Sequence, residues 1–479
     1  MQPVRVEEYV WEIPLGAASG MRAPGLIFAS KDLLDKAVED KAVEQVVNVA
    51  TLPGIVGHSL AMPDIHWGYG FPIGGVAATD VDNGGVVSPG GVGFDIGCGV
   101  RLLRSELDIS EVKPVIRELV DALGRAVPRG VGGKGAMPLS RADVTRVLAE
   151  GVGFPVSRGL GWDEDAAFTE DGGVLDNASP AEVSERAVER GAPQLGSLGA
   201  GNHFLEVQYV DQIRDTSAAD ALGLRAGQVC LMLHSGSRGV GHQACTDHLR
   251  EIDRLMHSLA IDVPDRQLAC IPFEHPAAQS YVGAMNAAGN FARANRQVLT
   301  HQAREAIAGV FGRSARELGL SVVYDIAHNL AKLEEHEVDG RRVTVCVHRK
   351  GATRAFGPSH PELPSSYRDV GQPVIVPGSM GTSSFVLVGT GSSRRSFFST
   401  CHGAGRAMSR TRAKKMMTGQ QLRDELRRQG IHIARSQWKL LSEEAPYAYK
   451  DAEQIVEVCE GAGLSRVVAR LRPIGVVKG

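Results

Sequence analysis

The sequence lacks a hydrophobic run long enough to cross a bilayer, and its first residues show no basic stretch followed by an apolar one. A membrane-spanning helix needs about 20 apolar residues, and a signal peptide needs that basic-then-apolar order. The seven cysteines are scattered singly, without the spacing of a disulfide framework. Cysteines used in this way are typical of a reducing compartment. These absences predict a cytoplasmic protein with no membrane segment.

Two common nucleotide-binding signatures are also missing. No glycine is followed by Lys-Ser or Lys-Thr, so the chain has no Walker A loop. Gly130, Gly132 and Gly135 match G-x-G-x-x-G, but no strand-like run precedes them and Pro138 follows closely. A dinucleotide-binding loop needs a strand before it and a helix after it. Any nucleotide is therefore expected to bind through a different kind of site.

The composition is that of a globular protein, with 43% hydrophobic and 22% charged residues among 479. Strand-like runs and helical patterns alternate irregularly, without the even rhythm of a Rossmann sheet or a TIM barrel. No repeat and no low-complexity linker divides the chain. We therefore expect an α+β fold in one large mixed domain, residues 1–479, with several β-sheets packed by helices.

Helical patterns are recognisable from apolar residues that recur at a spacing of about 3.6. They predict helices over residues 112–127, 140–150, 277–318 and 419–429. A further helix is predicted at 179–191, with Ser179 as N-cap, Pro180 in the first position and Gly191 as the stop. The acidic, glycine-containing stretch 162–177 is predicted to be an exposed excursion.

The net charge of −3 argues against a general nucleic-acid binder, but the charge is unevenly distributed. Residues 394–439 hold 12 lysines and arginines against Asp424 and Glu425, a local charge of +10. Basic runs of this kind are most often solvated helical faces. Because this run includes the glycine-lined turn at 401–406, a polyanionic partner is the better interpretation.

Metal-competent side chains stand at the ends of four strand-like runs. They are Asp95 and Cys98 in FDIGCG, His203 in GNHF, His234 in LMLHSGSRG and His328 in VVYDIAHN. Singly, such a histidine or cysteine is more often a structural residue than a ligand. Together they predict a metal cluster, because a thiolate can bridge two ions while a carboxylate and imidazoles complete each shell. Ligand softness favours zinc, whereas the mixture of Asp, Cys and His also allows manganese or iron.

Two glycine- and serine-rich loops offer donors to an anion. SGSRG, residues 235–239, directly follows His234 and precedes a helix predicted to start near Val240. Its backbone N–H groups and Arg238 would hold a phosphate near whatever His234 binds. GSMGTSS, residues 378–384, offers further hydroxyl and N–H donors. Either loop alone is also consistent with an ordinary turn.

The segment CHGAGR sets His402 against small residues, where the pattern suggests that a helix begins. Gly403, Ala404 and Gly405 leave backbone N–H groups open to a phosphate, and Arg406 adds a cation. A neutral imidazole is a competent nucleophile, and its attack on phosphorus needs such a cradle for the developing charge.

Six of these motifs occur in an order that resembles one family. GVGFDIGCGVR, GNHFLEVQ, HSGSRGVGH, DIAHN, PGSMGTSSFVL and CHGAGR are similar to motifs of the RtcB family of RNA-splicing ligases. The resemblance implies a GTP- and manganese-dependent enzyme that joins RNA 2′,3′-cyclic phosphate or 3′-phosphate ends to 5′-hydroxyl ends, in tRNA splicing or RNA repair. It implies RNA and GTP as partners, two Mn²⁺ ions as cofactors, and an archease-type activator as a partner to test.

The resemblance also implies residue roles. His402 is the expected nucleophile, which takes GMP. One manganese is expected on Cys98, His234 and His328, and the other on Asp95, Cys98 and His203. The expected nucleotide-binding residues are Asn202, Phe204, Glu206, Ser379, Ser384, Gly403, Ala404, Gly405, Arg406, Tyr449 and Lys478. Glu206 suits guanine, because a carboxylate accepts from N1–H and N2–H₂. Arg238 is expected to contact RNA phosphate.

Two other functions fit part of the sequence. A dinuclear metal-dependent phosphoesterase would use the metal cluster, with His402 as a general acid or a supporting residue, and would leave the nucleotide pocket unused. A non-catalytic RNA-binding protein or scaffold would use only the basic stretch 394–439. His58, His66 and His348 are interpreted as structural.

Overall fold

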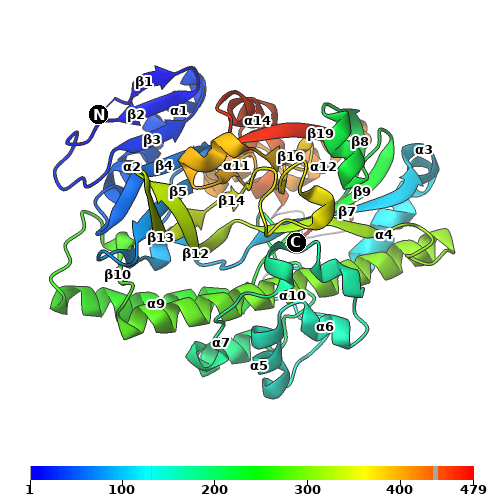
Figure 1. Ribbon diagram of the computed structural model, residues 1–479. Coiled ribbons are helices and arrows are strands. Elements are labelled where there is room, and N and C mark those ends of the chain that lie inside the picture. Colours follow the sequence, from blue (N-terminus) through cyan, green and yellow to red (C-terminus); the bar gives the residue numbers. More distant parts are fainter. Residues whose placement is uncertain (1, 131, 435–440) are drawn as a thin grey trace.

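The computed structural model describes residues 2–130, 132–434 and 441–479, and it shows the expected α+β fold with several sheets (Figure 1). One large sheet has seven strands in the order β1 (Val4–Glu7), β2 (Val10–Ile13), β3 (Gly25–Phe28), β4 (Ile55–His66), β5 (Ile73–Asp80), β13 (Arg341–Lys350) and β12 (Asn329–Val338). Most neighbours are antiparallel, whereas β3 and β4 are parallel.

The second large sheet carries the candidate site. Its order is β11 (Ser321–Ala327), β7 (Gly99–Asp108), β9 (Gln228–Ser235), β8 (Phe204–Ile213), β19 (Ser465–Lys478), β16 (Ser384–Gly389) and β15 (Pro373–Val376). β18 (His432–Ile433) joins β19 in parallel. The edge strands β11 and β15 contact each other, so this sheet curves toward closure. Two short ladders pair β6 (Val86–Val87) with β10 (Ile271–Pro272), and β14 (Ala352–Arg354) with β17 (Ser399–Cys401).

Helices pack around both sheets. They are α1 (Lys31–Glu39), α2 (Ala42–Val49), α3 (Ile109–Val112), α4 (Ile116–Ala126), α5 (Arg141–Glu150), α6 (Gly153–Ser157), α7 (Glu185–Gly191), α8 (Thr216–Leu222), α9 (Arg238–Ser258), α10 (Pro276–Phe311), α11 (Arg410–Met416), α12 (Gly419–Arg428) and α14 (Ala452–Gly461). The long helices α9 and α10 run beneath the strands, with α5, α6 and α7 below them (Figure 1). None of the helices described here is long and apolar enough to span a membrane.

The helix α10 packs directly beneath the chain segments that carry the site. It is buried along most of its length and is rich in alanine and glycine on its buried side. The turn at Gly97 approaches it so closely that a Cβ there would lie 2.9 Å from the Cα of Gly289 and 3.0 Å from the Cβ of Ala292. Gly97 also has a φ of +69°, which favours glycine. Small residues on both sides therefore bring the Asp95–Cys98 turn against the helix.

Most predicted helices are confirmed, and their boundaries differ for identifiable reasons. α5 and α12 match the predictions closely, with Ser140 as the N-cap of α5. Pro114 falls in a 3₁₀ turn that separates α3 from α4, so the predicted helix at 112–127 is divided. α10 ends earlier than predicted, because Gly312 takes a left-handed conformation with φ 62°.

The predicted cap of the helix at 179–191 is wrong. Ser179 precedes a single 3₁₀ turn, Pro180–Glu182, and the α-helix α7 starts only at Glu185. Ser184 is its N-cap, and its side chain accepts a hydrogen bond from the N–H of Ala187. The sequence offers two serines in similar positions, and the second supplies the cap.

The stretch 162–177, predicted to be an exposed excursion, is exposed at some positions and buried at others. Asp163 and Glu164 are exposed, but Asp165 is only 1% exposed. Its carboxylate accepts from both Nη atoms of Arg304, at 2.6 and 2.7 Å, and from Nε2 of Gln297 at 2.8 Å. The acidic residues that suggested solvent exposure include the one that pairs with α10.

This ion pair gives a stability prediction. Replacement Asp165→Ala leaves the Arg304 guanidinium buried without a counter-charge, so we expect a loss of about 3–5 kcal/mol in the free energy of unfolding. Urea denaturation measures it. The matched control is Asp163→Ala in the same 3₁₀ turn, Asp163–Ala166, where the exposed side chain should change stability by less than about 0.5 kcal/mol. Equal effects of both substitutions would contradict the prediction.

Candidate active site

The predicted metal ligands meet at one end of the second sheet. Cys98 immediately precedes β7, His203 precedes β8, His234 lies in β9, and His328 follows β11. These four strands are adjacent, and the register pairs His234 with Val100 of β7 and with Phe204 of β8. The backbone N–H of His328 also donates to the carbonyl of Cys98 at 2.8 Å. Strand pairing therefore assembles residues that lie more than 200 positions apart.

The ligands form two groups that share one sulfur. Cys98, His234 and His328 make the first group, and Asp95, Cys98 and His203 make the second. The Cys98 Sγ lies 3.3 Å from Nε2 of His234 and 3.4 Å from Nε2 of His203. Nε2 of His203 lies 2.9 Å from Oδ2 of Asp95, and the Nε2 atoms of His234 and His328 are 3.3 Å apart. This is the division of ligands expected from the resemblance.

These distances fit a metal-binding site. Metal–ligand bonds of about 2.0–2.3 Å place neighbouring ligands roughly 3–3.7 Å apart around one ion. Nδ1 of His203 lies 2.9 Å from the Leu198 carbonyl, to which it donates, so Nε2 presents a lone pair to the sulfur and the carboxylate. Among the described residues, none forms a hydrogen bond with the buried Nδ1 of His328. Burial lowers the pKa values of His234 and His328, which keeps both imidazoles neutral as ligands.

A buried ion pair beneath the ligands holds three of their chain segments. Arg296 of α10 donates through Nη1 to the carbonyls of Gly97 and Ser235, at 2.8 and 2.9 Å, one residue before Cys98 and one residue after His234. Its Nη2 donates to Oδ1 of Asp325 at 2.7 Å, three residues before His328. Burial alone would raise the pKa of Asp325, but the charges of Arg296 and Arg101 lower it to about 2.

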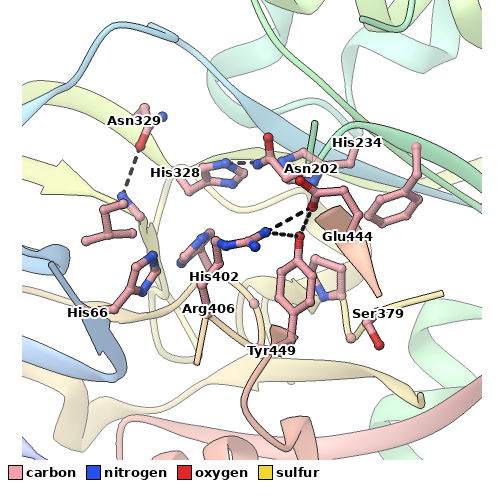
Figure 2. A pocket seen from close by; sticks show the side chains of 18 of the residues that line it. His66, Asn202, His234, His328, Asn329, Ser379, His402, Arg406, Glu444 and Tyr449 are labelled. Atoms are coloured by element: carbon pink, nitrogen blue, oxygen red, sulfur yellow. Dashed lines mark hydrogen bonds and ion pairs between the residues drawn. The ribbon is translucent and has the colours of Figure 1, made fainter. Parts of the chain in front are cut away.

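A cavity of about 290 Å³ opens beside the metal ligands. His402 lies in it, with its ring centroid 4.9 Å from that of His328. Figure 2 shows His66 and Asn329 on one side of His402, and Tyr449 and Ser379 on the other. His402, the predicted nucleophile, therefore lies next to the metal ligand His328, and one end of the cavity extends to each side of it.

His402 is held in one orientation by a buried aspartate. Oδ2 of Asp64, at the end of β4, lies 2.6 Å from Nδ1 of His402 and accepts from its backbone N–H at 3.0 Å. An imidazole that donates through Nδ1 keeps its lone pair on Nε2. The helix expected at this point is absent: His402 follows β17, and α11 begins only at Arg410. A tight turn through Gly403–Gly405 presents the histidine instead.

The end of the cavity near Tyr449 has features suited to a nucleotide base. Glu206 is 2% exposed, and burial raises the pKa of its carboxyl to about 7, although Gln208 donates to it at 2.7 Å. The ammonium of Lys478 lies 5.6 Å from the centroid of the Phe204 ring. A carboxyl, a cation and aromatic rings together offer both polar and stacking contacts.

A buried carboxylate that the sequence did not point out organises the same end. Glu444 is 3% exposed and accepts from the hydroxyl of Tyr449, from Nη1 of Arg406 at 3.3 Å and from Nε of Arg410 at 3.1 Å (Figure 2). Lys478 adds a further positive charge nearby and helps to lower the pKa of Glu444. One carboxylate thus fixes an aromatic ring and two guanidinium groups toward the cavity.

Comparison with known proteins agrees with this geometry. The family model described as "tRNA-splicing ligase RtcB" matches residues 45–479. The chain belongs to the RtcB family. It is 52% identical over 476 residues to the tRNA-splicing ligase RtcB of Archaeoglobus fulgidus, covering 99% of this chain and 98% of the relative. It is 54% identical over 437 residues to the RNA-splicing ligase RtcB of Mycobacterium tuberculosis, covering 91% of this chain and 100% of the relative.

The resemblance inferred from the six motifs is therefore confirmed, and the structure of this RtcB protein places most of the predicted residues together. Lining the cavity are His234, His328, His402, Asn202, Phe204, Glu206, Ser379, Gly403, Ala404, Gly405, Arg406, Tyr449 and Lys478. Ser384 is not on the wall; its hydroxyl accepts from the N–H of Gly378 and from Gln208 behind Glu206. Arg238 is also off the wall, and it donates to Ser197 and to the carbonyl of Gly130.

Several residues at the RtcB cavity were not predicted as site residues, among them Asp64, His66, Lys350 and Glu444. Asp64 and Glu444 act on predicted residues, while His66 and Lys350 line the wall themselves. The structural interpretation of His66 is therefore incomplete. The sequence signal for them was weak, since each is a single polar residue in a segment without a motif. His348 is structural as interpreted, because its Nε2 accepts from the N–H of Ser88 in a fully buried position.

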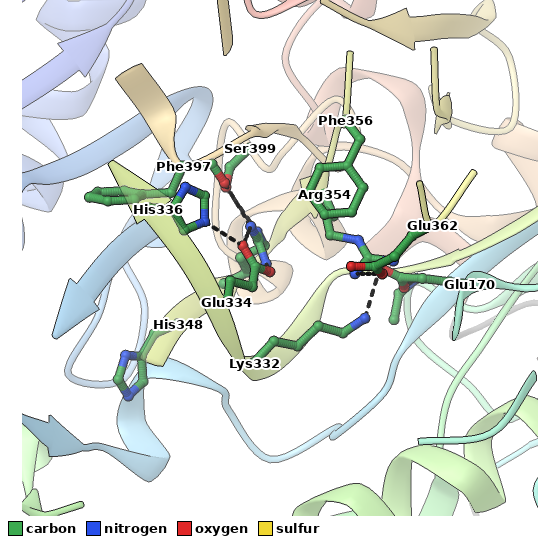
Figure 3. A network of polar contacts seen from close by, with 12 residues as sticks. Glu170, Lys332, Glu334, His336, His348, Arg354, Phe356, Glu362, Phe397 and Ser399 are labelled. Carbon is green, nitrogen blue, oxygen red and sulfur yellow. Dashed lines mark hydrogen bonds and ion pairs between the residues drawn. The ribbon is translucent and has the colours of Figure 1, made fainter. Parts of the chain in front are cut away.

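A polar network behind the RtcB cavity supports the strand that leads to His402 (Figure 3). Arg349 of β13 donates to the Ser399 hydroxyl at 2.8 Å, to the Phe397 carbonyl at 2.7 Å and to Glu334. Glu170 pairs with Arg354 of β14 at 3.2 Å and accepts from the N–H of Ala327, just before His328. Buried charges therefore connect the strand before His402 to the strand before His328.

Arg296 gives a prediction about metal binding. Replacement Arg296→Lys keeps the positive charge but loses the planar fork that reaches two carbonyls and Asp325. We expect the affinity for Co²⁺, followed by thiolate–cobalt absorption, to fall about 10- to 100-fold. The control Arg250→Ala, at an exposed position of α9, should bind Co²⁺ as the parent does. Parent-like affinity in the folded Arg296→Lys variant would contradict the positioning role.

Proposed function

We propose that this RtcB protein is an RNA ligase that uses GTP and manganese to join RNA 2′,3′-cyclic phosphate or 3′-phosphate ends to 5′-hydroxyl ends. The observation that carries the proposal is the arrangement around His402. An aspartate-held imidazole stands next to a shared-thiolate metal site, within a cavity that also contains a buried base-binding end. The names of the relatives add that proteins with about half of these residues in common are RNA-splicing ligases.

The first chemical step uses the free Nε2 of His402. Nε2 attacks the α-phosphorus of GTP, an N–P bond forms, and the bond to the β-phosphate oxygen breaks to release pyrophosphate. The Nδ1 proton stays hydrogen bonded to Asp64, whose carboxylate stabilises the charge that the ring gains. The backbone N–H groups of Gly403 and Gly405 and the Arg406 guanidinium offset charge on the phosphate, whereas the N–H of Ala404 donates to the Pro377 carbonyl.

The metal ions supply Lewis acidity, which neutralises phosphate oxygens. Asp95, Cys98, His203, His234 and His328 would hold them. Manganese is compatible with this mixture of oxygen, nitrogen and sulfur donors.

The remaining steps transfer the guanylate to RNA. Water first opens a cyclic phosphate to a 3′-phosphate. An oxygen of that 3′-phosphate then attacks the phosphorus bound to His402, so the N–P bond breaks and Nε2 regains its lone pair. The RNA 5′-hydroxyl finally attacks the 3′-phosphorus, a phosphodiester forms and GMP leaves. Asn202 lies on the cavity wall directly before the metal ligand His203, and we assign it the orientation of a phosphate or hydroxyl oxygen.

Glu206 supports the choice of guanine. Its carboxylate accepts from the N1–H and the N2 amino group, and adenine offers neither in that arrangement. Lys478 and Gln208 favour the ionised form of this carboxyl, whereas burial opposes it. Tyr449 lies at the same end and provides a ring on which a base can stack.

Covalent guanylylation gives the decisive test. The protein incubated with GTP and Mn²⁺ should gain the mass of one GMP on the peptide that contains His402, and His402→Ala should abolish this gain. Asp64→Asn should reduce the rate by roughly 100-fold or more, since the wrong ring tautomer is favoured. The acid-labile, alkali-stable product should form without RNA. A metal-dependent phosphoesterase would hydrolyse the phosphate ester and leave the protein unmodified.

The pKa of Glu206 gives a pH prediction. Because the carboxylate must be ionised to accept two hydrogen bonds, selectivity for GTP over ATP should rise with pH through a midpoint near 7 and level off about one unit above it. Competition binding between pH 5.5 and 8.5 measures the ratio of the GTP and ATP affinities. Because both nucleotides carry the same triphosphate, its own titration cancels in this ratio. Glu206→Gln should lose both the selectivity and its pH dependence. A flat profile in the parent would contradict the assignment.

A further inference from the structure

A row of three aromatic rings leads from the cavity to the surface at the end opposite the base-binding residues. Phe94 lines the cavity, one residue before Asp95. The rings of Phe94 and Tyr69 meet edge to face, with centroids 5.3 Å apart. On its other side Phe94 stacks with His242 of α9, at 5.2 Å and an interplanar angle of 29°. We call Tyr69, Phe94 and His242 the aromatic row.

The aromatic row is open to solvent. Tyr69 and Phe94 are half-buried, and His242 is exposed. Trp67, two residues before Tyr69 on the same loop, is 46% exposed. Aromatic side chains that serve only the core are normally enclosed, so exposed rings gathered at a cavity mouth indicate a binding surface.

Lys350 brings an amine to this end of the cavity, and burial lowers the pKa of its ammonium group to about 7. Its side chain is buried on the cavity wall, and Nζ donates to the carbonyls of Tyr69 and Phe71. Nζ also lies 5.9 Å from the centroid of the Tyr69 ring. Within the described part of the chain, no carboxylate forms an ion pair with it. A buried cation of this kind is stabilised when a phosphate group comes next to it.

Rings beside a cation are the elements with which proteins hold unpaired nucleic acid. Bases stack on aromatic faces whatever their sequence, and cations track the phosphates. The proposed reaction brings two RNA ends to His402, one carrying a terminal phosphate and one carrying an uncharged hydroxyl. With GMP at the Tyr449 end, the end that contains Phe94 and Lys350 remains free.

We propose that the aromatic row and Lys350 bind the unpaired RNA end that terminates in a 3′-phosphate or 2′,3′-cyclic phosphate. The last bases stack on the row, and Lys350 attracts the phosphate toward the metal ligands. This inference rests on the proposed ligase function. It adds that the RNA end carrying the phosphate binds at the end of the cavity that contains Phe94 and Lys350.

The test measures stacking directly. A short single-stranded RNA with a 3′-phosphate and 2-aminopurine as its last base is titrated with the Mn²⁺-loaded protein in the absence of GTP. Stacking should quench the fluorescence. The double variant Tyr69→Ala/His242→Ala should lose most of the quenching and bind about 10-fold or more weakly. Tyr69→Phe/His242→Phe retains the rings and should bind and quench like the parent.

Two controls make the outcome specific. His257→Ala removes an exposed histidine from the last turn of the same helix, and it should change neither binding nor quenching. An RNA with a 5′-hydroxyl and a 3′-hydroxyl should bind the parent and the double alanine variant equally. Parent-like binding and quenching by the double alanine variant would overturn the proposal, as would equal losses in the alanine and phenylalanine variants.

Guanylylation of His402 separates this inference from the proposed function. Measured without RNA, it should be unchanged in the double alanine variant, because neither Tyr69 nor His242 lines the cavity. If the parent protein fails to take GMP, the ligase proposal is wrong, whatever the titration shows. If the parent takes GMP but the 3′-phosphate RNA is not quenched, the ligase proposal stands and the aromatic row is not its RNA surface.

Discussion

The site depends on one buried contact, the Arg296–Asp325 ion pair beneath the metal ligands. The arginine reaches the carbonyls next to Cys98 and His234, and the aspartate belongs to the strand that ends at His328. Ligand atoms about 3.3 Å apart repel one another when no ion lies between them, so the protein must hold them by other means. A fully buried, charge-assisted network does this, although removing an arginine and an aspartate from solvent is energetically unfavourable.

The same principle recurs on the other side of the cavity. Asp64 fixes the ring of His402, and Glu444 fixes Tyr449, Arg406 and Arg410. In each case a buried carboxylate without direct involvement in bond formation determines where a functional group points. The cavity is therefore formed from pre-oriented polar groups and needs little rearrangement to surround a phosphate. Burying these charged groups lowers the free energy of unfolding, and the apolar residues buried along helices such as α10 offset that loss.

Much of the candidate site could be predicted from the sequence, because its residues stand at strand ends, most of them within two residues of a glycine. Asp95, Cys98, His203, His234, His328 and His402 were all found in this way. Asp64, His66, Lys350 and Glu444 were not, since a lone polar residue in a strand or turn looks the same whether it faces solvent or a cavity. The acidic stretch 162–177 shows the converse error, because Asp165 has the composition of a surface residue and the environment of a core residue. Similarly, Ser179 and Ser184 both suit an N-cap, and packing selects the second.

The sequence alone determined the α+β class, most helices, the family and the ligand types, because these depend on local periodicity and on short motifs. The tertiary structure alone decided which buried carboxylates hold His402 and Tyr449, which nitrogen of His402 is free, and which end of the cavity faces the aromatic row. Those properties arise from contacts between segments up to 338 positions apart, such as the one between Asp64 and His402. Pairing over such distances is set by strand register and core packing, which no local pattern encodes.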